Sequence, residues 1–554
     1  MTRTKLFALS ALTLALTSNT AQAAVYEISE LASNEQGVQS VSVAIGEQGG
    51  VVSQVQFPFN PPIDIELLDL ENNEALREQL NDPDAVAQGN ISDEDLVILY
   101  NVLSGSDSPL TQKLGEVQSY IGDANGATEV TGFDQASTAF DGLTRSVNTL
   151  VYDINALGNA VGTGTAPYYK VNYTNDEGEQ LTYLVRDFNQ RGFVYLNDQV
   201  LPLLPPEDTL GGRSAARGIA DNLWVAGSVS TEAPETLAGQ VSNCEDPEER
   251  GDQPVELCLQ SVRNANSSNF QMRAALWKIS NDGQIESLET FPLAFEPDED
   301  STTTFNSQAN DVNSQGVGVG TAQNRVPHLN DRIRTMPAVF IDGQTNSLLL
   351  DKEDYTSGMA AGINDNGLVT GYGVRFVNGF ERSKFFVYDI NSETLTFPDD
   401  FFPGSSSLPR DINNNNVIVG DGEVDTVTGN GAVRRRNGFI YDHDSGSFQN
   451  LNDLIACDAP YTIVQANGIN DNGEIAATAV VEKPKRNIAG EIEQDEQGND
   501  IIESTVIAVK LNPVPGGDIE DCSDSEEKFE RQAGGLSWLL LGMLGLIGWR
   551  RYRG

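Results

Sequence analysis

A short motif recurs along most of this chain, and it limits the folds that the chain can adopt. The clearest copies read Gly-Ile-Asn-Asp-Asn-Gly and occupy residues 362–367 and 468–473. Asparagine and glycine accept the positive φ of tight turns, and β-branched residues flank each copy, so the motif predicts a β-hairpin. Three weaker copies and two degenerate ones begin at Asp411, Asp311, Asp153, Gly218 and Ala44.

A second motif follows the copies and runs into a polar turn, as in Phe-Phe-Val-Tyr-Asp at 385–389 and Gly-Phe-Ile-Tyr-Asp at 438–442. Two hairpins per unit give four strands. The last four units are spaced by 51, 49 and 57 residues, counted between positions 312, 363, 412 and 469. This period is close to the roughly 50 residues of a kelch-type propeller blade.

Four-stranded sheets repeated at this period close around an axis and leave no long exposed edge. We therefore expect an all-β fold, a β-propeller of six or seven four-stranded blades over residues 24–513. Because the segment Val25–Ile28 resembles the second motif, we expect it to close the ring by pairing near Val506–Val509.

One interval is about twice as long as a blade, since 108 residues separate Ile45 from Ile154. Helical patterns occur in it at 71–80, at 93–103 with Ser92 as the N-cap, and at 110–121. We expect a small helical insertion over residues 58–132. A free-standing domain is the alternative, but few large apolar residues are available for a separate core.

The N-terminus has the pattern of a secretory signal peptide. Two basic residues precede the apolar stretch Leu6–Leu16, and Ala21-Gln22-Ala23 supplies the small-x-small cleavage pattern. We expect a signal peptide over residues 1–23, cut by signal peptidase between Ala23 and Ala24. An uncleaved anchor is the alternative, although the apolar stretch is short for one.

The C-terminus carries a paired glycine, an apolar run at 536–549 and three terminal arginines. This tail, residues 534–554, resembles the GlyGly-CTERM signal of Gram-negative envelope proteins. The resemblance implies a transmembrane sorting helix that a rhomboid-type protease, rhombosortase, processes near Gly534 and Gly535. A permanent single-span anchor is the other interpretation. Residues 514–533 form an acidic linker between the propeller and the tail.

The repeated Ile-Asn-x-Asn-Gly and aromatic-Val-Tyr-Asp motifs also resemble HAF-type extracellular repeats of secreted bacterial proteins. Together with the tail they resemble an uncharacterised envelope family known as a domain of unknown function. The resemblance implies a fold and a location in the cell envelope or outside the cell, and no reaction.

Charge restricts the partners of the protein. The formal net charge is −47, which repels nucleic acid and anionic lipid, so we exclude DNA and RNA as ligands. Hydrophobic residues still make up 39% of the chain, enough to build a core.

The four cysteines lie in a chain that we expect to be exported, where disulfides form. Three pairings are possible. We favour Cys244 with Cys258, which would close a short polar loop, and hence Cys457 with Cys522. A zinc site is disfavoured because the sequence has no Cys-x-x-Cys pair.

Catalytic motifs are scarce. The chain has no Gly-x-Ser-x-Gly elbow, no His-Glu-x-x-His motif and no phosphate loop. We expect both histidines, His328 and His443, to be exposed turn residues rather than catalytic bases. The triplet Arg434–Arg436 is either a solvated strand end or an anion-binding patch.

Calcium is the most plausible bound ion, and no other cofactor is expected. The repeat turns offer hard oxygen ligands, although hairpin turns require the same residues for backbone reasons alone. The weak candidates are Asn364, Asp365, Asn366, Asn470, Asp471 and Asn472.

Two functions remain open at this stage. The first is a non-catalytic binding or structural module of the cell surface for a glycan or protein partner. The second is a secreted glycan hydrolase or lyase that uses carboxylates at the propeller mouth. The scarcity of His, Arg and Lys favours the first.

Overall fold

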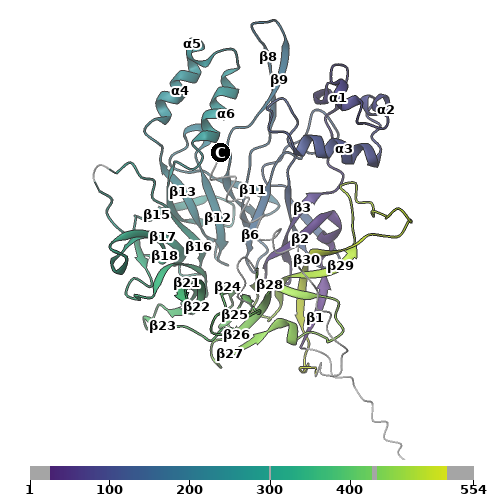
Figure 1. The fold of residues 1–554 in the computed structure, drawn as a ribbon. Helices are drawn as coiled ribbons and strands as arrows, with labels where there is room; N and C mark the ends of the chain where they lie inside the picture. The colour runs from purple at the N-terminus through teal and green to yellow at the C-terminus, as the bar shows by residue number, and fades with distance from the viewer. Residues whose placement is uncertain (1–24, 299–300, 427–432, 521–554) are drawn as a thin grey trace, which may run out of the picture.

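Seven four-stranded antiparallel sheets make up most of the molecule (Figure 1). The structure is a computed structural model that describes residues 25–298, 301–426 and 433–520. The first strands of the sheets contact one another in sequence around a closed ring, so they lie nearest the axis. The prediction of a β-propeller is confirmed, and the number of blades is seven.

In blades 1 and 3 to 6 the strands follow one another in chain order from the axis outward, and in blade 2 an inserted hairpin separates the second strand from the third. Blade 1 contains β2 (Gly37–Ile45), β3 (Val51–Pro58), β4 (Val117–Gly122) and β5 (Ala127–Val130); blade 2, β6 (Thr149–Ile154), β7 (Ala160–Gly164), β10 (Arg191–Leu196) and β11 (Gln199–Leu203); blade 3, β12 (Ser214–Ile219), β13 (Trp224–Glu232), β14 (Gln271–Ile279) and β15 (Ile285–Thr290). Blade 4 contains β16 (Ser307–Val312), β17 (Gly318–Val326), β18 (Arg332–Ile341) and β19 (Gln344–Ser347); blade 5, β20 (Tyr355–Ile363), β21 (Leu368–Val377), β22 (Phe380–Asp389) and β23 (Thr394–Thr396); blade 6, β24 (Ser407–Ile412), β25 (Val417–Glu423), β26 (Arg436–Asp442) and β27 (Ser447–Asn450).

Blade 7 joins the two ends of the described chain. Its β28 (Thr462–Ile469), β29 (Ile475–Pro484) and β30 (Ile502–Pro513) come from the C-terminal side, and β1 (Tyr26–Glu30) adds the outermost strand. The predicted closure is confirmed with a shifted register, because Glu30 lies opposite Val509 and Tyr26 opposite Pro513.

The core explains the aromatic motif. Phe385 and Phe386 are adjacent on β22, so their side chains point to opposite faces of the sheet, and both are fully buried. Phe385 packs with Phe439 of blade 6, and Phe386 packs with Val339 of blade 4. Each such ring contributes roughly 1.5–3 kcal/mol by burial, so the third strand holds its blade to both neighbours.

The helical insertion of blade 1 runs from residue 59 to 116, between β3 and β4, and is shorter than predicted. It contains η2 (Ile65–Leu68), α1 (Glu74–Arg77), α2 (Pro83–Ala87) and α3 (Asp93–Ser104). The helix predicted at 93–103 is confirmed, and the Ser92 hydroxyl accepts the amide N–H of Asp95. The helix predicted at 110–121 is wrong, because residues 117–122 pair with β3 as a blade strand.

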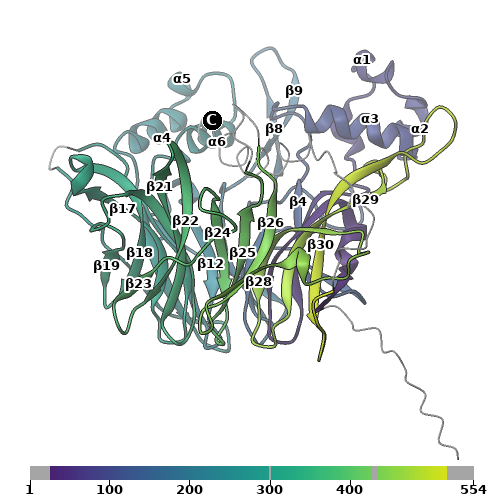
Figure 2. The same cartoon turned by 60° about the horizontal axis from the view of Figure 1, so that its bottom comes forward.

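Two further insertions and a long loop were not predicted. Blade 2 carries the hairpin β8 (Tyr169–Thr174) and β9 (Gln180–Val185); blade 3 carries α4 (Leu237–Glu245), α5 (Pro247–Arg250) and α6 (Val255–Ala265); blade 7 carries the loop 485–501. All of them, like the helices of blade 1, connect the second strand of a blade to the third. They therefore rise from one face of the propeller, here called the insertion face (Figure 2).

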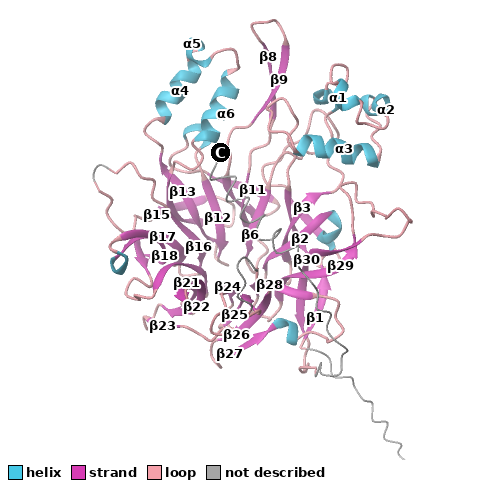
Figure 3. Ribbon diagram, in the orientation of Figure 1, coloured by secondary structure: helices cyan, strands magenta, loops and turns pink. Residues whose placement is uncertain are grey.

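The insertions of blades 7, 1, 2 and 3 contact one another and form a crescent, in which helices flank the β8–β9 hairpin (Figure 3). The contacts between successive insertions are a hydrogen bond from Asn60 N to Ile488 O, an ion pair between Lys170 and Asp64 at 2.8 Å, and a hydrogen bond from the Tyr173 hydroxyl to Asp252. One half of the insertion face is thus raised, whereas in blades 4 to 6 the described connections between the second and third strands contain no α-helix, and only the short 3-10 helix η4 (Pro327–Leu329) in blade 4.

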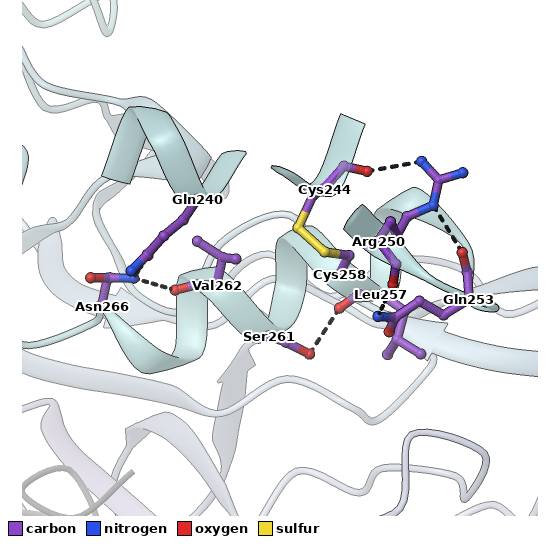
Figure 4. Close-up of a disulfide and its surroundings, with 9 residues drawn as sticks. All are labelled: Gln240, Cys244, Arg250, Gln253, Leu257, Cys258, Ser261, Val262 and Asn266. Carbon is purple, nitrogen blue, oxygen red and sulfur yellow. Dashed lines mark hydrogen bonds between the residues drawn. A yellow bond between two sulfur atoms is a disulfide. The ribbon is translucent and has the colours of Figure 1, made fainter. Parts of the chain in front are cut away.

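A disulfide fastens the blade 3 insertion (Figure 4). It joins Cys244 on α4 to Cys258 on α6, with the two Cα atoms 5.6 Å apart, as predicted. The Arg250 guanidinium donates to the carbonyl of Cys244 at 2.8 Å and so fixes the short α5 turn between them. In the other predicted pair, Cys522 lies outside the described residues; the amide of Cys457 donates to Glu520, two positions before it.

The processing sites Ala23, Ala24, Gly534 and Gly535 and the tail 534–554 lie outside the described residues. Within the described ranges, no helix is long and apolar enough to cross a membrane.

Candidate functional site

The asparagine of the repeat motif links neighbouring blades. In the turn between β20 and β21, the side-chain oxygen of Asn364 accepts the amide N–H groups of Asn366 and Leu368 at 3.1 and 3.0 Å. Its side-chain nitrogen donates to the carbonyl of Asn413 in blade 6 at 3.0 Å. One buried side chain therefore shapes its own turn and holds the next blade.

The same bond recurs around the ring. Equivalent asparagines donate to the next blade in four further places: Asn155 to Ala220, Asn313 to Asn364, Asn413 to Asn470, and Asn470 to Gly46. Blades 1 and 3 have glycine and alanine at this position and lack the bond. In those blades the amides of Gln48 and Asn222 reach the neighbouring turn instead.

The calcium candidates belong to this ring. Those of blade 5 and those of blade 7 lie in separate turns, with blade 6 between them. Their side chains bond to adjacent blades: Asp365 accepts from Ser314 N at 2.8 Å, and Asp471 accepts from Asn414 N at 2.7 Å. Among the described residues, no group of three or more His, Cys, Asp or Glu side chains is placed to hold a metal ion.

Three half-buried aspartates, Asp153, Asp311 and Asp411, stand one residue before the end of the inner strands of blades 2, 4 and 6. Each accepts an isoleucine N–H of the next blade at 2.8 Å, from Ile219, Ile363 and Ile469 respectively. Burial raises the pKa of all three carboxyl groups, that of Asp311 to about 7. The negative charges of the others raise the pKa of Asp153 further. Because backbone amides already engage these carboxylates, their role is to connect blades.

A β-bulge interrupts every inner strand at the same place, one residue before the aspartate or its glycine or alanine equivalent. The bulged residues are Val43, Tyr152, Arg217, Asn310, Ala361, Arg410 and Asn467. A bulge frees one residue from the ladder and redirects its side chain. The seven positions carry five different residue types, so the side chain at the bulge varies around the ring although the backbone position is the same.

The bulge of blade 3 leads to a cavity of about 350 Å³ between blades 3 and 4. Its walls are mostly polar: Gln190, Arg213, Arg217, Ser228, Met272, Asn306, Ser307, Gln308, Thr321, Gln323 and Thr335. Most of these residues lie in the halves of their strands nearest the insertion face. In a chain of net charge −47, the walls contain two arginines and no carboxylate.

The two arginines differ in their bonding. Arg213 donates to the Ser267 carbonyl at 2.6 Å and to the Gln190 side chain at 3.2 Å. Arg217 stacks over the Tyr152 ring at 3.9 Å, and its Nε is buried without a hydrogen-bond partner in the described structure. A buried donor without a partner is costly, so Arg217 is the least satisfied polar group in the cavity.

Neither histidine is the exposed turn residue that we expected. Both are half-buried: the Nε2 of His328 lies 2.8 Å from the carbonyl of Tyr355, and His443 packs against Tyr441. The arginine triplet is not bare either, since each member forms an ion pair: Arg434 with Glu423, Arg435 with Asp425, and Arg436 with Asp421.

Sequence reasoning missed the cavity. Its walls come from positions between Gln190 and Thr335, and nothing in that spacing marks them as neighbours. A signal for the two unpredicted insertions did exist, because the motif copies at Ile154, Ile219 and Val312 are 65 and 93 residues apart, longer than a blade.

Seven closed blades with a crescent of insertions on one face define the molecule as a seven-bladed β-propeller. The chain belongs to the family described as protein of unknown function DUF3466, whose sequence profile matches residues 4–552. The expectation of an uncharacterised family is therefore confirmed.

Two solved structures show only remote likeness. The structure of puromycin hydrolase has a TM-score of 0.34 at 10% identity, over 83% of this chain and 52% of that one, so this chain spans about half of its length. A protein of unknown function from Dyadobacter fermentans DSM 18053 has a TM-score of 0.30 at 8% identity, over 89% of this chain and 98% of that one. The comparison with curated proteins found no match.

Proposed function

We propose that this protein is an exported, non-catalytic binding module of the Gram-negative cell envelope. It presents the insertion face of its propeller to a surface glycan or protein. The observation that carries the proposal is the cavity beside the crescent. Its walls contain hydrogen-bonding groups that lack a partner within the described structure, and they contain no carboxylate.

The walls of this cavity suit binding better than hydrolysis. A glycosidase uses two carboxylates flanking the scissile bond. The three inner-strand aspartates are half-buried and accept backbone N–H groups of adjacent blades, and the cavity itself is lined by amides, hydroxyls and guanidinium groups. A glycan hydrolase or lyase with carboxylates at the propeller mouth is therefore the less favoured function.

The proposed location of the protein in the cell rests on the sequences at the two ends of the chain. Residues 1–23 would be removed by signal peptidase, and the tail 534–554 would pass through the membrane until a rhomboid-type protease processes it near the glycine pair. HAF-type repeats and the GlyGly-CTERM signal both belong to this proposal. The acidic segment after Pro513 would hold the propeller away from anionic head groups, which repel its carboxylates.

A glycan array probed with the mature protein, together with a pull-down from envelope extract, tests the proposal. We expect at least one glycan class or one envelope protein to be retained specifically, and retained glycans to keep their chain length in mass spectra. Shortening or unsaturation of the glycan would instead establish the hydrolase or lyase. Absence of retention in both experiments would overturn the binding function.

A further inference from the structure

We infer that the cavity between blades 3 and 4 binds the anionic unit of a saccharide, one sugar ring that bears a carboxylate or a phosphate. The inference rests on the proposed binding function and names the ligand chemistry of its site. Its central residue is Arg217, the bulged residue of β12.

The side chain of Arg217 is positioned to bind an anion. The bulge releases it from the strand ladder, and the Tyr152 ring 3.9 Å away supports one face of the guanidinium plane. No hydrogen-bond acceptor within the described structure pairs with its Nε. A guanidinium presents a planar fork of donors that matches a carboxylate or phosphate, and the terminal Nη groups of Arg217, which form no hydrogen bond within the described structure, would donate to such a group in the cavity.

Comparison with blade 6 supports this assignment. Its bulged residue, Arg410, is also an arginine, but there the fully buried carboxylate of Asp421 accepts from its Nε at 2.8 Å. In blade 6 the protein thus pairs the arginine of the bulge with one of its own carboxylates. It leaves Arg217 facing a cavity without an acidic residue.

Other groups in the cavity suit the hydroxyls of a sugar. The side-chain hydroxyls of Ser228, Thr321 and Thr335 have no hydrogen-bond partner among the described residues. The Gln308 amide nitrogen donates to Asn310, which leaves its oxygen available; the Gln323 oxygen accepts from Asn306, which leaves its nitrogen available. Sugar hydroxyls both donate and accept, so a wall that offers both fits them.

Size and polarity narrow the ligand further. A volume of about 350 Å³ lies at the lower end of the range of small-molecule sites and fits one ring of a longer chain. Met272 is the only apolar residue in the walls, which offers little to a hydrophobic peptide side chain.

Calorimetric titration of the mature protein with D-glucuronate, glucose 6-phosphate, D-glucose and inorganic phosphate tests the inference. We expect glucuronate or glucose 6-phosphate, whichever the site prefers, to bind at least tenfold more tightly than both glucose and inorganic phosphate. The two charged sugars distinguish a carboxylate from a phosphate as the recognised group. If glucose bound as tightly as the charged sugars, the site would not recognise the charge of its ligand. If inorganic phosphate bound as tightly as glucose 6-phosphate, the site would recognise the ion alone and not the sugar.

Arg217→Gln should weaken binding of the preferred sugar at least tenfold, and Arg217→Lys, which keeps the charge without the fork, should weaken it less. Arg334→Gln is the matched control, because it removes the same charge from an exposed position on β18 of the same region and should change affinity less than twofold. Equal melting temperatures of the variants would verify folding, since Arg217 makes no hydrogen bond that the substitution could remove. Unchanged affinity in Arg217→Gln, or no binding of any of the four probes, would overturn the inference. Retention on the array or in the pull-down would still uphold the binding function in that case.

Discussion

Replacing Asn364 by alanine tests whether the repeat motif holds the propeller together. The side chain makes four hydrogen bonds, two within its own turn and two to Asn413 and Asn416 of blade 6. Each is worth roughly 0.5–1.5 kcal/mol net, and buried groups that lose their partner cost more. We expect Asn364→Ala to lower the free energy of unfolding by about 4 kcal/mol, taking these contributions together.

The assay is urea unfolding followed by tryptophan fluorescence, since the propeller contains Trp224 and Trp277, the second of which is fully buried. The matched control is Asn366→Ala in the same turn. Asn366 also donates to blade 6, at 2.9 Å, but it is exposed, so water replaces the lost bonds and the loss should stay below about 1 kcal/mol. Equal effects of the two substitutions would refute the argument from burial.

The same variants separate a structural role from calcium binding. If the oxygens of these turns mainly shape the turns and link the blades, EDTA should leave the urea concentration at the midpoint of unfolding of the wild-type protein unchanged. If Asn364 were a calcium ligand, EDTA would destabilise the wild-type protein and leave Asn364→Ala unaffected. That result would replace our account of the ring.

Three other changes probe the closure, the buried charges and the tail. Deleting residues 25–30 removes β1 and exposes the edge of β30, so the melting temperature of the whole propeller should fall by several degrees; an unchanged value would show that β1 does not close the ring. The pKa of Asp311 is about 7 in the fold against about 3.9 in an unfolded chain, so its proton stabilises the fold at low pH and this contribution is lost as the pH rises from about 4 to 7. The fall of melting temperature over that range should be shallower in Asp311→Asn, and equal slopes would contradict this. Replacing Gly534 and Gly535 by leucine should block processing and leave full-length protein in the membrane fraction, whereas wild-type protein whose intact mass includes Gly554 would rule out a processed tail.

Local pattern carried much of the fold. The repeat turns, their spacing and the paired phenylalanines of the third strand predicted four-stranded blades, and the Val25–Ile28 segment predicted how the ring closes. These features are readable because hairpin turns and strand burial depend on residues a few positions apart. The same is true of α3, because its N-cap, Ser92, directly precedes the first residue of the helix.

Other predictions failed where local signals compete. Residues 110–121 contain apolar residues at spacings that fit a helix, but pairing with β3 places Val117–Gly122 in the blade. The hairpin and the helices inserted in blades 2 and 3 were overlooked because the copy at Gly218 is degenerate, so the intervals of 65 and 93 residues on either side of it were not interpreted as blades with insertions.

The sequence by itself determined the blade unit, the closing strand and the Cys244–Cys258 disulfide, because each depends on short-range geometry or on a repeated pattern. Only the tertiary structure decided what the motif residues are for. The repeat asparagines were interpreted from the sequence as turn formers, yet in five of the seven blades their amides also donate to the next blade. The cavity at Arg217 also exists only in three dimensions, because its walls come from strands of different blades that ring closure brings together.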